Sequence, residues 1–235
     1  MGKPDIIYED NDIIVCYKPA GIATQTRRIG QQDMESFIRN YRAAKNEPPY
    51  VGIVHRLDQP VEGVMVFAKN QKAAASLSRQ IKEHTTEKYY HAASRGQGVS
   101  GADNKEDNHD PAWHTLTDYI SFDKRTNTSK ITSEKDRQAK KAVLQYRILS
   151  NECNKTEFDI KLLTGRHHQI RLQLANIGYP LIGDTKYGKP ASNNSGTGNV
   201  AGRTGSCVRE QLALCSYKLV FEHPATGERM TFELP

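Results

Sequence analysis

Short apolar runs separated by turn residues predict a chain with many β-strands. Residues 6–8 and 13–17 flank a polar turn at 9–12, which is the pattern of a hairpin. The run at 64–67 is apolar throughout, as in a buried strand. The remaining predicted strands, including those of a closing hairpin, are 88–94, 142–149, 156–163, 212–222 and 228–235.

Apolar residues spaced three and four positions apart predict helices at 34–41, 71–84 and 167–178. Asp33 and Asn70 precede the first two helices, and their side chains are suited to cap the free N–H groups of a first helical turn. Gly178 is expected to end the third helix, because glycine readily adopts the left-handed backbone found after a helix C-terminus.

These strands and helices follow no regular βαβ order. We therefore predict an α+β fold with a mixed, largely antiparallel central sheet flanked by helices and loops. Residues 1–235 are expected to form a single domain, since one core suits a chain of this length. Two polar segments, 98–111 and 189–206, are predicted to be variable loops, and the glycines of the second miss the spacing of a phosphate-binding loop.

The charge of the chain sharpens this picture only slightly. Lys and Arg number 33 against 27 Asp and Glu, which gives a net charge of +6 and a pI near 9.0. This balance favours a polyanionic partner, although a lysine-rich surface on a protein with another role accounts for it equally well. No run approaches the roughly 20 apolar residues of a membrane helix, and the N-terminus lacks an apolar signal core. We expect a cytoplasmic protein without a membrane partner.

Polar residues gather at three places beside predicted core elements. HRLD at 55–58 puts Asp58 two residues after an arginine and just ahead of the buried run. RHHQIR at 166–171 lies between a strand and a helix, where an arginine is suited to hold a carboxylate ionised. In KYYHA at 88–92, Tyr89 and Tyr90 point to opposite faces of a strand. Taken singly, an aspartate in this position is more often a turn or cap residue and a strand tyrosine more often a core residue, whereas the arginine cluster fits a structural ion pair as well as catalysis.

Taken together, these stretches resemble the RluA-type family of RNA pseudouridine synthases. The matching segments occur in the family's order, and HRLD followed about a hundred residues later by TGRxHQIR is the most specific pair. The segments are KPAG (18–21), VHRLDQPVEGVMVFAK (54–69), KYYHA (88–92), TGRHHQIRLQLANIGYPLIGD (164–184) and HPATGE (223–228). The resemblance implies the pseudouridine synthase fold and the isomerisation of specific uridines in structured ribosomal or transfer RNA.

The resemblance also implies roles for individual residues. Asp58 matches the family's essential carboxylate, Tyr90 the tyrosine that contacts the target base, and Arg171 the arginine that pairs with the carboxylate. Arg56 matches the arginine that takes part in flipping the target nucleotide. Supporting roles in substrate binding are expected for the remaining motif residues, His55, Arg166, His168 and Gln169.

No cofactor is implied, because the isomerisation needs neither a redox change nor phosphate transfer. A metal is not expected either, since the four cysteines lie far apart and form no CxxC pair. The expected partner is RNA, bound by a monomer without an obligatory protein partner. Many relatives carry an N-terminal S4-type RNA-binding domain, whereas this chain begins at the catalytic domain, so we expect that domain to bind the substrate by itself.

Two positions depart from the family's pattern. His167 follows TGR, where a small or hydroxyl residue is usual, and Glu62 stands where Ser or Thr is common. Both departures bear on contacts with RNA rather than on the presumed catalytic residues.

Two other functions are compatible with the sequence. A catalytically silent RNA-binding protein would keep the fold, although it has no need of Asp58. A nucleoside-cleaving hydrolase would need a second carboxylate across the scissile bond, for which Glu62 is the nearest candidate. For the isomerase itself, the sequence leaves open whether Asp58 adds to the base, attacks the sugar or removes a sugar proton.

Overall fold

The computed structural model describes residues 3–28, 30–95, 112–152, 154–188 and 210–235. The helices are α1 (Met34–Ala44), α2 (Gln71–Lys82) and α3 (Gln169–Asn176). The strands are β1 (Asp5–Glu9), β2 (Ile13–Lys18), β3 (Gly52–Ile53), β4 (Glu62–Ala68), β5 (Glu87–Arg95), β6 (His114–Asp123), β7 (Thr128–Thr132), β8 (Lys140–Glu152), β9 (Lys155–Leu162), β10 (Leu214–Glu222) and β11 (Arg229–Glu233).

The strands form one 11-stranded sheet, and its order does not follow the sequence. The path is β1-β2-β4-β10-β5-β9-β8-β6-β7, while β3 pairs with β4 and β11 with β10. Only β4 and β10 are parallel among the pairs that the structure describes. The predicted mixed, largely antiparallel sheet of an α+β fold is therefore confirmed.

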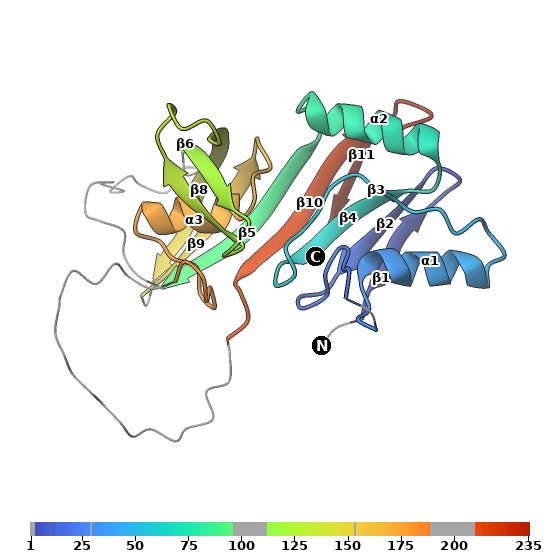
Figure 1. Ribbon diagram of the computed structural model, residues 1–235, viewed down its shortest axis with the longest axis horizontal. Coiled ribbons are helices and arrows are strands. Elements are labelled where there is room, and N and C mark those ends of the chain that lie inside the picture. The colour runs from blue at the N-terminus through green and yellow to red at the C-terminus, as the bar shows by residue number, and fades with distance from the viewer. Residues whose placement is uncertain (1–2, 29, 96–111, 153, 189–209) are drawn as a thin grey trace, which may run out of the picture.

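The long strands β5 and β10 join two halves of the molecule (Figure 1). One half carries β1, β2, β4 and α1, and the other carries β6, β8, β9 and α3. Strand β10 comes from the C-terminal part of the chain and lies between β4 and β5, pairing with both. It therefore joins two strands from the N-terminal half of the chain that do not pair with each other. This topology brings the loop before β4 and the start of α3 to the same face of the sheet.

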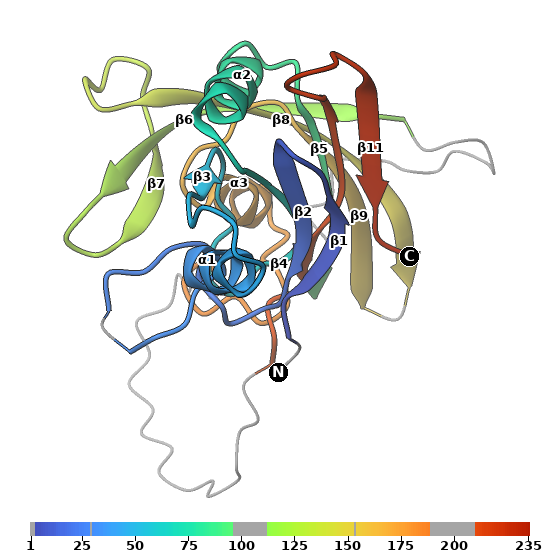
Figure 2. The ribbon, with the colours of Figure 1, turned by 90° about the vertical axis from the view of Figure 1, so that its right-hand side faces the viewer.

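Helices α1 and α3 lie on one side of the sheet (Figure 2). Their apolar side chains, among them Ile38 and Leu174, share a core with Met65 and Phe67 of β4. The opposite face of β4 packs with α2 in a second, smaller core around Leu77. Alternating side chains of one buried strand thus serve both cores, which explains why its sequence is apolar throughout.

The predicted caps are present. The Asp33 carboxylate accepts from the Ser36 N–H, the Ser36 hydroxyl accepts from the Asp33 N–H in return, and the Asn70 side chain accepts from the Ala73 N–H. Gly178 follows α3 with a φ of 90°, as expected for a residue that ends a helix.

The predicted hairpins at both ends of the chain are confirmed, whereas the hairpin of β6 and β7 was not predicted. Most side chains of β6 are exposed or only partly buried, so apolar residues alternate weakly along it. The predicted variable loops at 98–111 and 189–206 both lie outside the described residues. No helix in the described ranges is long and apolar enough to cross a bilayer.

Candidate active site

One cleft of about 1050 Å³ opens on the face that carries α3. It is bounded by the loop between β3 and β4, by β5, and by the turn that leads into α3. Every residue for which the sequence predicts a catalytic or substrate-binding role lines this cleft: His55, Arg56, Asp58, Tyr90, Arg166, His168, Gln169 and Arg171. Segments more than a hundred residues apart in the sequence therefore meet at one place.

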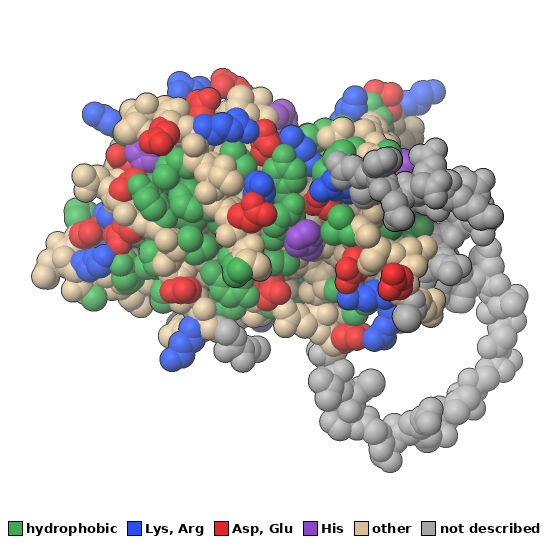
Figure 3. Space-filling view, turned by 180° about the vertical axis from the view of Figure 1, so that it is seen from behind, with side chains coloured by type: hydrophobic (Ala, Val, Ile, Leu, Met, Phe, Trp, Pro, Cys, Tyr) green, Lys and Arg blue, Asp and Glu red, His purple; other side chains and the backbone are tan. Residues whose placement is uncertain are grey.

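The charged residues that line the cleft are basic with one exception. Asp58 is the only carboxylate among the described residues that line it. The Lys and Arg residues of the lining are Arg56, Lys82, Lys88, Arg166 and Arg171. Elsewhere acidic and basic side chains are interspersed, as on the surface seen in Figure 3. A cleft with this excess of positive charge is suited to a polyanion.

The loop that carries Asp58 is held on both sides of this residue. On one side, the Thr24 hydroxyl donates to the Leu57 carbonyl at 3.0 Å and accepts from the Leu57 N–H at 3.2 Å. On the other side, the Gln59 carbonyl accepts from the Gly21 N–H at 2.8 Å. These contacts hold the backbone on both sides of Asp58 in place before any substrate binds.

Lys18, of the KPAG segment, also holds the loop that carries Asp58, from the buried side. Its ammonium group is fully buried and donates to the carbonyls of Pro19, Ile22 and Gln59. Burial lowers the pKa of Lys18 to about 8, while the negative charges of Asp58 and Glu62 act in the opposite direction. The ammonium group therefore joins the 19–22 loop to the residue that follows Asp58.

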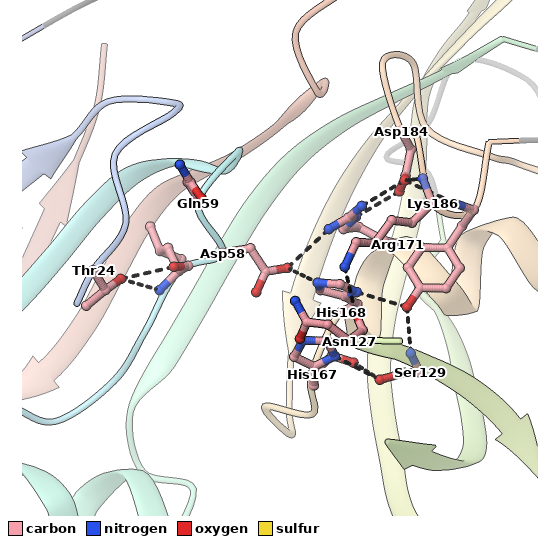
Figure 4. A network of polar contacts seen from close by, with 12 residues as sticks. Thr24, Asp58, Gln59, Asn127, Ser129, His167, His168, Arg171, Asp184 and Lys186 are labelled. Atoms are coloured by element: carbon pink, nitrogen blue, oxygen red, sulfur yellow. Dashed lines mark hydrogen bonds and ion pairs between the residues drawn. The ribbon is translucent and has the colours of Figure 1, made fainter. Parts of the chain in front are cut away.

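Arg171 is held between two carboxylates (Figure 4). Its Nε and Nη2 donate to the two oxygens of Asp184, each at 2.8 Å, whereas its Nη1 lies 3.5 Å from Asp58 Oδ2. Asp184 also accepts from the backbone N–H groups of Lys186 and Tyr187. The fork of donors is thus anchored on Asp184 and presents its remaining nitrogen to Asp58.

His168 also faces Asp58. Its Nε2 lies 3.5 Å from Asp58 Oδ2, and its Nδ1 lies 2.9 Å from the Tyr187 hydroxyl oxygen. That oxygen accepts from the Ser129 N–H at 2.8 Å, so the Tyr187 hydroxyl can donate its proton to Nδ1. Burial and the positive charge of Arg171 lower the pKa of His168 to about 3. The ring is therefore neutral at pH 7, and with this arrangement its Nε2–H points at the carboxylate.

Neither Asp184 nor Tyr187 was predicted as a site residue. Asp184 belongs to a segment that carried the family resemblance, but it stands 13 positions after Arg171 and has no special spacing to it. Tyr187 lies beyond that segment. Only the fold shows that both side chains support residues in contact with Asp58.

Tyr90 lies on β5 with its ring in the core and at the cleft wall. Burial raises the pKa of its hydroxyl, an effect that the Ser216 hydroxyl partly opposes. Tyr89 points to the other face of the sheet, where its hydroxyl donates to Glu87 at 2.6 Å. Tyr89 and Tyr90 therefore point to opposite faces of the strand, as predicted.

His55 and Gln169 hold the walls of the cleft in place. His55 Nε2 accepts from the Val66 N–H at 3.1 Å, and burial, with the Lys88 charge, lowers the pKa of His55 to about 3. Gln169 Oε1 accepts from the Thr164 hydroxyl at 2.8 Å and from the Arg166 N–H at 3.0 Å. These contacts tie the loop before β4 and the turn before α3 to the sheet.

The two predicted arginines at the cleft differ in their contacts. Arg56 is exposed, and the structure gives its side chain no hydrogen bond within the described part of the chain. Arg166 is only partly exposed, and its Nε donates to the Lys141 carbonyl at 2.9 Å. Arg56 is therefore the more available of the two for contact with a ligand.

Glu62 does not line the cleft. Its carboxylate accepts from the Tyr17 hydroxyl at 2.8 Å and from Gln211 Nε2 at 3.1 Å. The cleft therefore lacks, among its described residues, the second carboxylate that a glycosidase-like hydrolysis requires.

One group of side chains in the described ranges has the spacing of a metal site, and it lies outside the cleft. It comprises Asp10, Asp12 and His223. His223 Nδ1 accepts from the N–H groups of Ala225 and Thr226, so Nε2 carries the proton and donates to Asp10 at 2.9 Å. Because both ring nitrogens are occupied, this group is explained as a link between the two terminal hairpins.

Comparison with known proteins agrees with the chemistry of the cleft. A family model described as RNA pseudouridylate synthase matches residues 12–176. The chain belongs to this family. The ribosomal large subunit pseudouridine synthase D of Vibrio cholerae is 32% identical over 239 residues, which cover 98% of this chain and 67% of that protein. The protein of the same name from Pseudomonas aeruginosa is 34% identical over 237 residues, which cover 98% and 68%. The chain is thus an RNA pseudouridine synthase, an isomerase, as the sequence predicts.

Solved structures show the same fold. Human RNA pseudouridylate synthase domain containing 4 matches with a TM-score of 0.72 at 19% identity, over 98% of this chain and 88% of that one. Human RNA pseudouridylate synthase domain containing 1 gives a TM-score of 0.69 at 24% identity, over 99% and 83%. The pseudouridine synthase fold is therefore confirmed from the sequence match and from the structure separately.

Proposed function

We propose that this pseudouridine synthase modifies uridines in folded RNA with Asp58 as its catalytic carboxylate. The observation that carries the proposal is that Asp58 is the single carboxylate among the described residues of a cleft whose other charged side chains are basic. Its Oδ2 faces Arg171 and His168, while no contact of Oδ1 is found within the described part of the chain. Oδ1 is therefore the oxygen that we expect to meet the substrate.

The reaction breaks the N1–C1′ bond, turns the uracil and joins C5 to C1′. N1 gains a proton and C5 loses one, so no electrons enter or leave. An ionised carboxylate is required whether it adds to the base, attacks C1′ or removes a sugar proton. The Arg171 guanidinium and the His168 Nε2–H both face Asp58 Oδ2 and limit the rotation of the carboxylate.

The target nucleotide must leave its stack before Asp58 can reach it, at a cost of a few kcal/mol. Arg56 is exposed beside Asp58, where it is placed to contact a phosphate or fill the vacated space. The Tyr90 ring forms part of the cleft wall and is suited to hold the extruded base. His55, Arg166, His168 and Gln169 keep these groups in position or add to the binding surface.

We propose large-subunit ribosomal RNA as the first substrate to test, because the names of the curated relatives refer to it. Transfer RNA is the alternative that the same assay covers. We also propose that the protein acts in the cytoplasm and as a monomer, since a single copy of the chain is enough to bring all the predicted site residues together in the cleft. Size-exclusion chromatography with light scattering tests the monomer, and a dimer that is required for activity would contradict it.

Tritium release from RNA labelled at uridine C5 tests the function, with transcripts of large-subunit ribosomal RNA and bulk transfer RNA as substrates. The wild type should release tritium, and Asp58→Asn, which keeps the shape of the side chain, should release none while still binding RNA. Glu62→Gln is the matched control, because it removes a neighbouring carboxylate that lies outside the cleft. Full activity of Asp58→Asn would refute the assignment. Liberation of free uracil would instead indicate a hydrolase, and binding of RNA without either product a silent binding protein.

A further inference from the structure

Three aromatic rings in mutual contact form a row along one wall of the cleft. The His167 ring lies 3.7 Å from the His168 ring, with 29° between the planes, and 4.2 Å from the Phe122 ring, with 49° between them. His168 is buried and faces Asp58, whereas Phe122, near the end of β6, is 38% exposed and lines the cleft. This row of rings therefore leads from Asp58 to an aromatic ring that is open to solvent.

The middle ring is held in one orientation. The Ser129 hydroxyl donates to the His167 carbonyl at 2.8 Å, and its oxygen lies 3.0 Å from His167 Nδ1 (Figure 4). Because the hydroxyl proton is used by the carbonyl, Nδ1–H donates to the Ser129 oxygen, and the ring cannot turn without losing this bond. Phe122 thus packs on a ring that the β7 strand keeps in place.

The position of Phe122 calls for an explanation. An apolar ring at the edge of a cationic cleft gives nothing to phosphate binding, yet unpaired bases stack on aromatic side chains with roughly 1–3 kcal/mol for each base. Arg56 and Arg166 line the same cleft and supply positive charge for the backbone of such a strand. The surroundings of Phe122 therefore suit a nucleobase with its phosphates better than the apolar side chain of a protein partner.

We propose that Phe122, supported by His167, is a stacking platform for an unpaired base next to the target uridine. This inference rests on the proposed function, since the target uridine is the base that Asp58 modifies. The ligand is a base in a single-stranded loop or bulge, because paired bases do not expose their faces.

Variants of the platform separate substrate binding from chemistry. Phe122→Ala should raise KM for the RNA by roughly 5- to 150-fold and change kcat little, as expected from the loss of one stacked base. His167→Ser should raise KM less, and Phe122→Trp should restore the wild-type value. Trp113→Ala is the matched control: this tryptophan has a similar exposure of 39% but packs on Arg147 and does not line the cleft. An unchanged KM in Phe122→Ala would overturn the proposal.

Changes in the RNA identify the base. Once the modified uridine is mapped, each flanking base is replaced in turn by an abasic nucleotide. One of these changes should raise KM for the wild type as much as Phe122→Ala does, and should have no further effect in Phe122→Ala. The opposing result is that, at every flanking position, the abasic nucleotide and Phe122→Ala raise KM independently, so that the combined increase is the product of the two. In that case Phe122 does not stack on a neighbouring base and the proposal is wrong.

A binding measurement keeps this inference distinct from the proposed function. The probe is a fluorescein-labelled single-stranded RNA of about nine nucleotides, a length within the range that such binding sites cover. Phe122→Ala should lower its affinity and Trp113→Ala should not, as measured by anisotropy. If the wild type releases no tritium but this difference is found, the proposed function fails and the stacking surface stands. If the affinities are equal while the wild type is active, the stacking surface fails alone.

Discussion

The structure predicts that the protein loses stability as the pH falls from 7.5 to 5.5, because two histidines are held neutral. Burial lowers the pKa of both His55 and His168 to about 3, against about 6.5 in an unfolded chain. Between these values the unfolded state binds protons that the folded state does not. Stability is therefore fully present above pH 6.5 and decreases as the pH falls toward 3.

The magnitude follows from the same pKa values. From pH 7.5 to 5.5, each histidine should lower the free energy of unfolding by about 1.4 kcal/mol, and both together by about 3 kcal/mol. The depressed carboxyl groups of Glu9 and Glu87, with pKa values of about 2, contribute little in this range because their unfolded pKa lies near 4.5. Burial also lowers the pKa of His167, which adds to the loss in the same direction. A change of this size is a large part of the roughly 5–15 kcal/mol that stabilises a typical domain.

Urea denaturation at a series of pH values and constant ionic strength measures this effect. His168→Asn suits the left-handed backbone at φ 54° and keeps an oxygen near the Tyr187 hydroxyl, but does not titrate. His55→Gln likewise keeps an acceptor for the Val66 N–H. Each variant should remove about 1.4 kcal/mol of the pH-dependent loss, whatever its stability at pH 7.5.

His84→Asn is the matched control. His84 has the same left-handed backbone, with φ 60°, but its side chain is exposed. This substitution should leave the pH dependence of the wild type unchanged. The reasoning is refuted if His168→Asn and His55→Gln lose stability with falling pH as steeply as the wild type does.

Three further substitutions test the close packing at Gly63, the Lys18 contacts and the contact of Arg171 with Asp184. Gly63→Ala should destabilise the fold by about 3 kcal/mol or more in urea, because φ is 138° and a Cβ would lie 2.3 Å from the Ser216 carbonyl; an unchanged midpoint would contradict this. Lys18→Met leaves the Pro19 and Ile22 carbonyls without this donor, while the Gln59 carbonyl keeps the Gly21 N–H, and should cost about 3 kcal/mol by the same measurement, with wild-type stability as the opposing result. Arg171→Lys cannot make the two-fold contact with Asp184 and should lower kcat for tritium release by roughly 100-fold, whereas an unaltered kcat would show that the fork is dispensable.

The fold class could be predicted from the sequence because the signals are local. Alternating apolar residues and turn residues mark the terminal hairpins, and Asp33 and Asn70 mark the first residues of their helices through contacts within a few positions. The β6–β7 hairpin had no comparable signal, since its side chains are mostly exposed or partly buried. Its importance to the cleft comes from Phe122 and Ser129, whose neighbours belong to another segment of the chain.

The sequence by itself determined the identity of the chemistry: the motifs around Asp58, Tyr90 and Arg171 are specific enough to indicate an RNA pseudouridine synthase. Only the tertiary structure decided how these residues are supported. Arg171 has its closest contact with Asp184 rather than with Asp58, and Glu62 points away from the cleft to Tyr17. The physical reason is that side-chain partners are chosen by distance in the folded sheet, where β10 and the turn before α3 bring together segments that are far apart in the sequence.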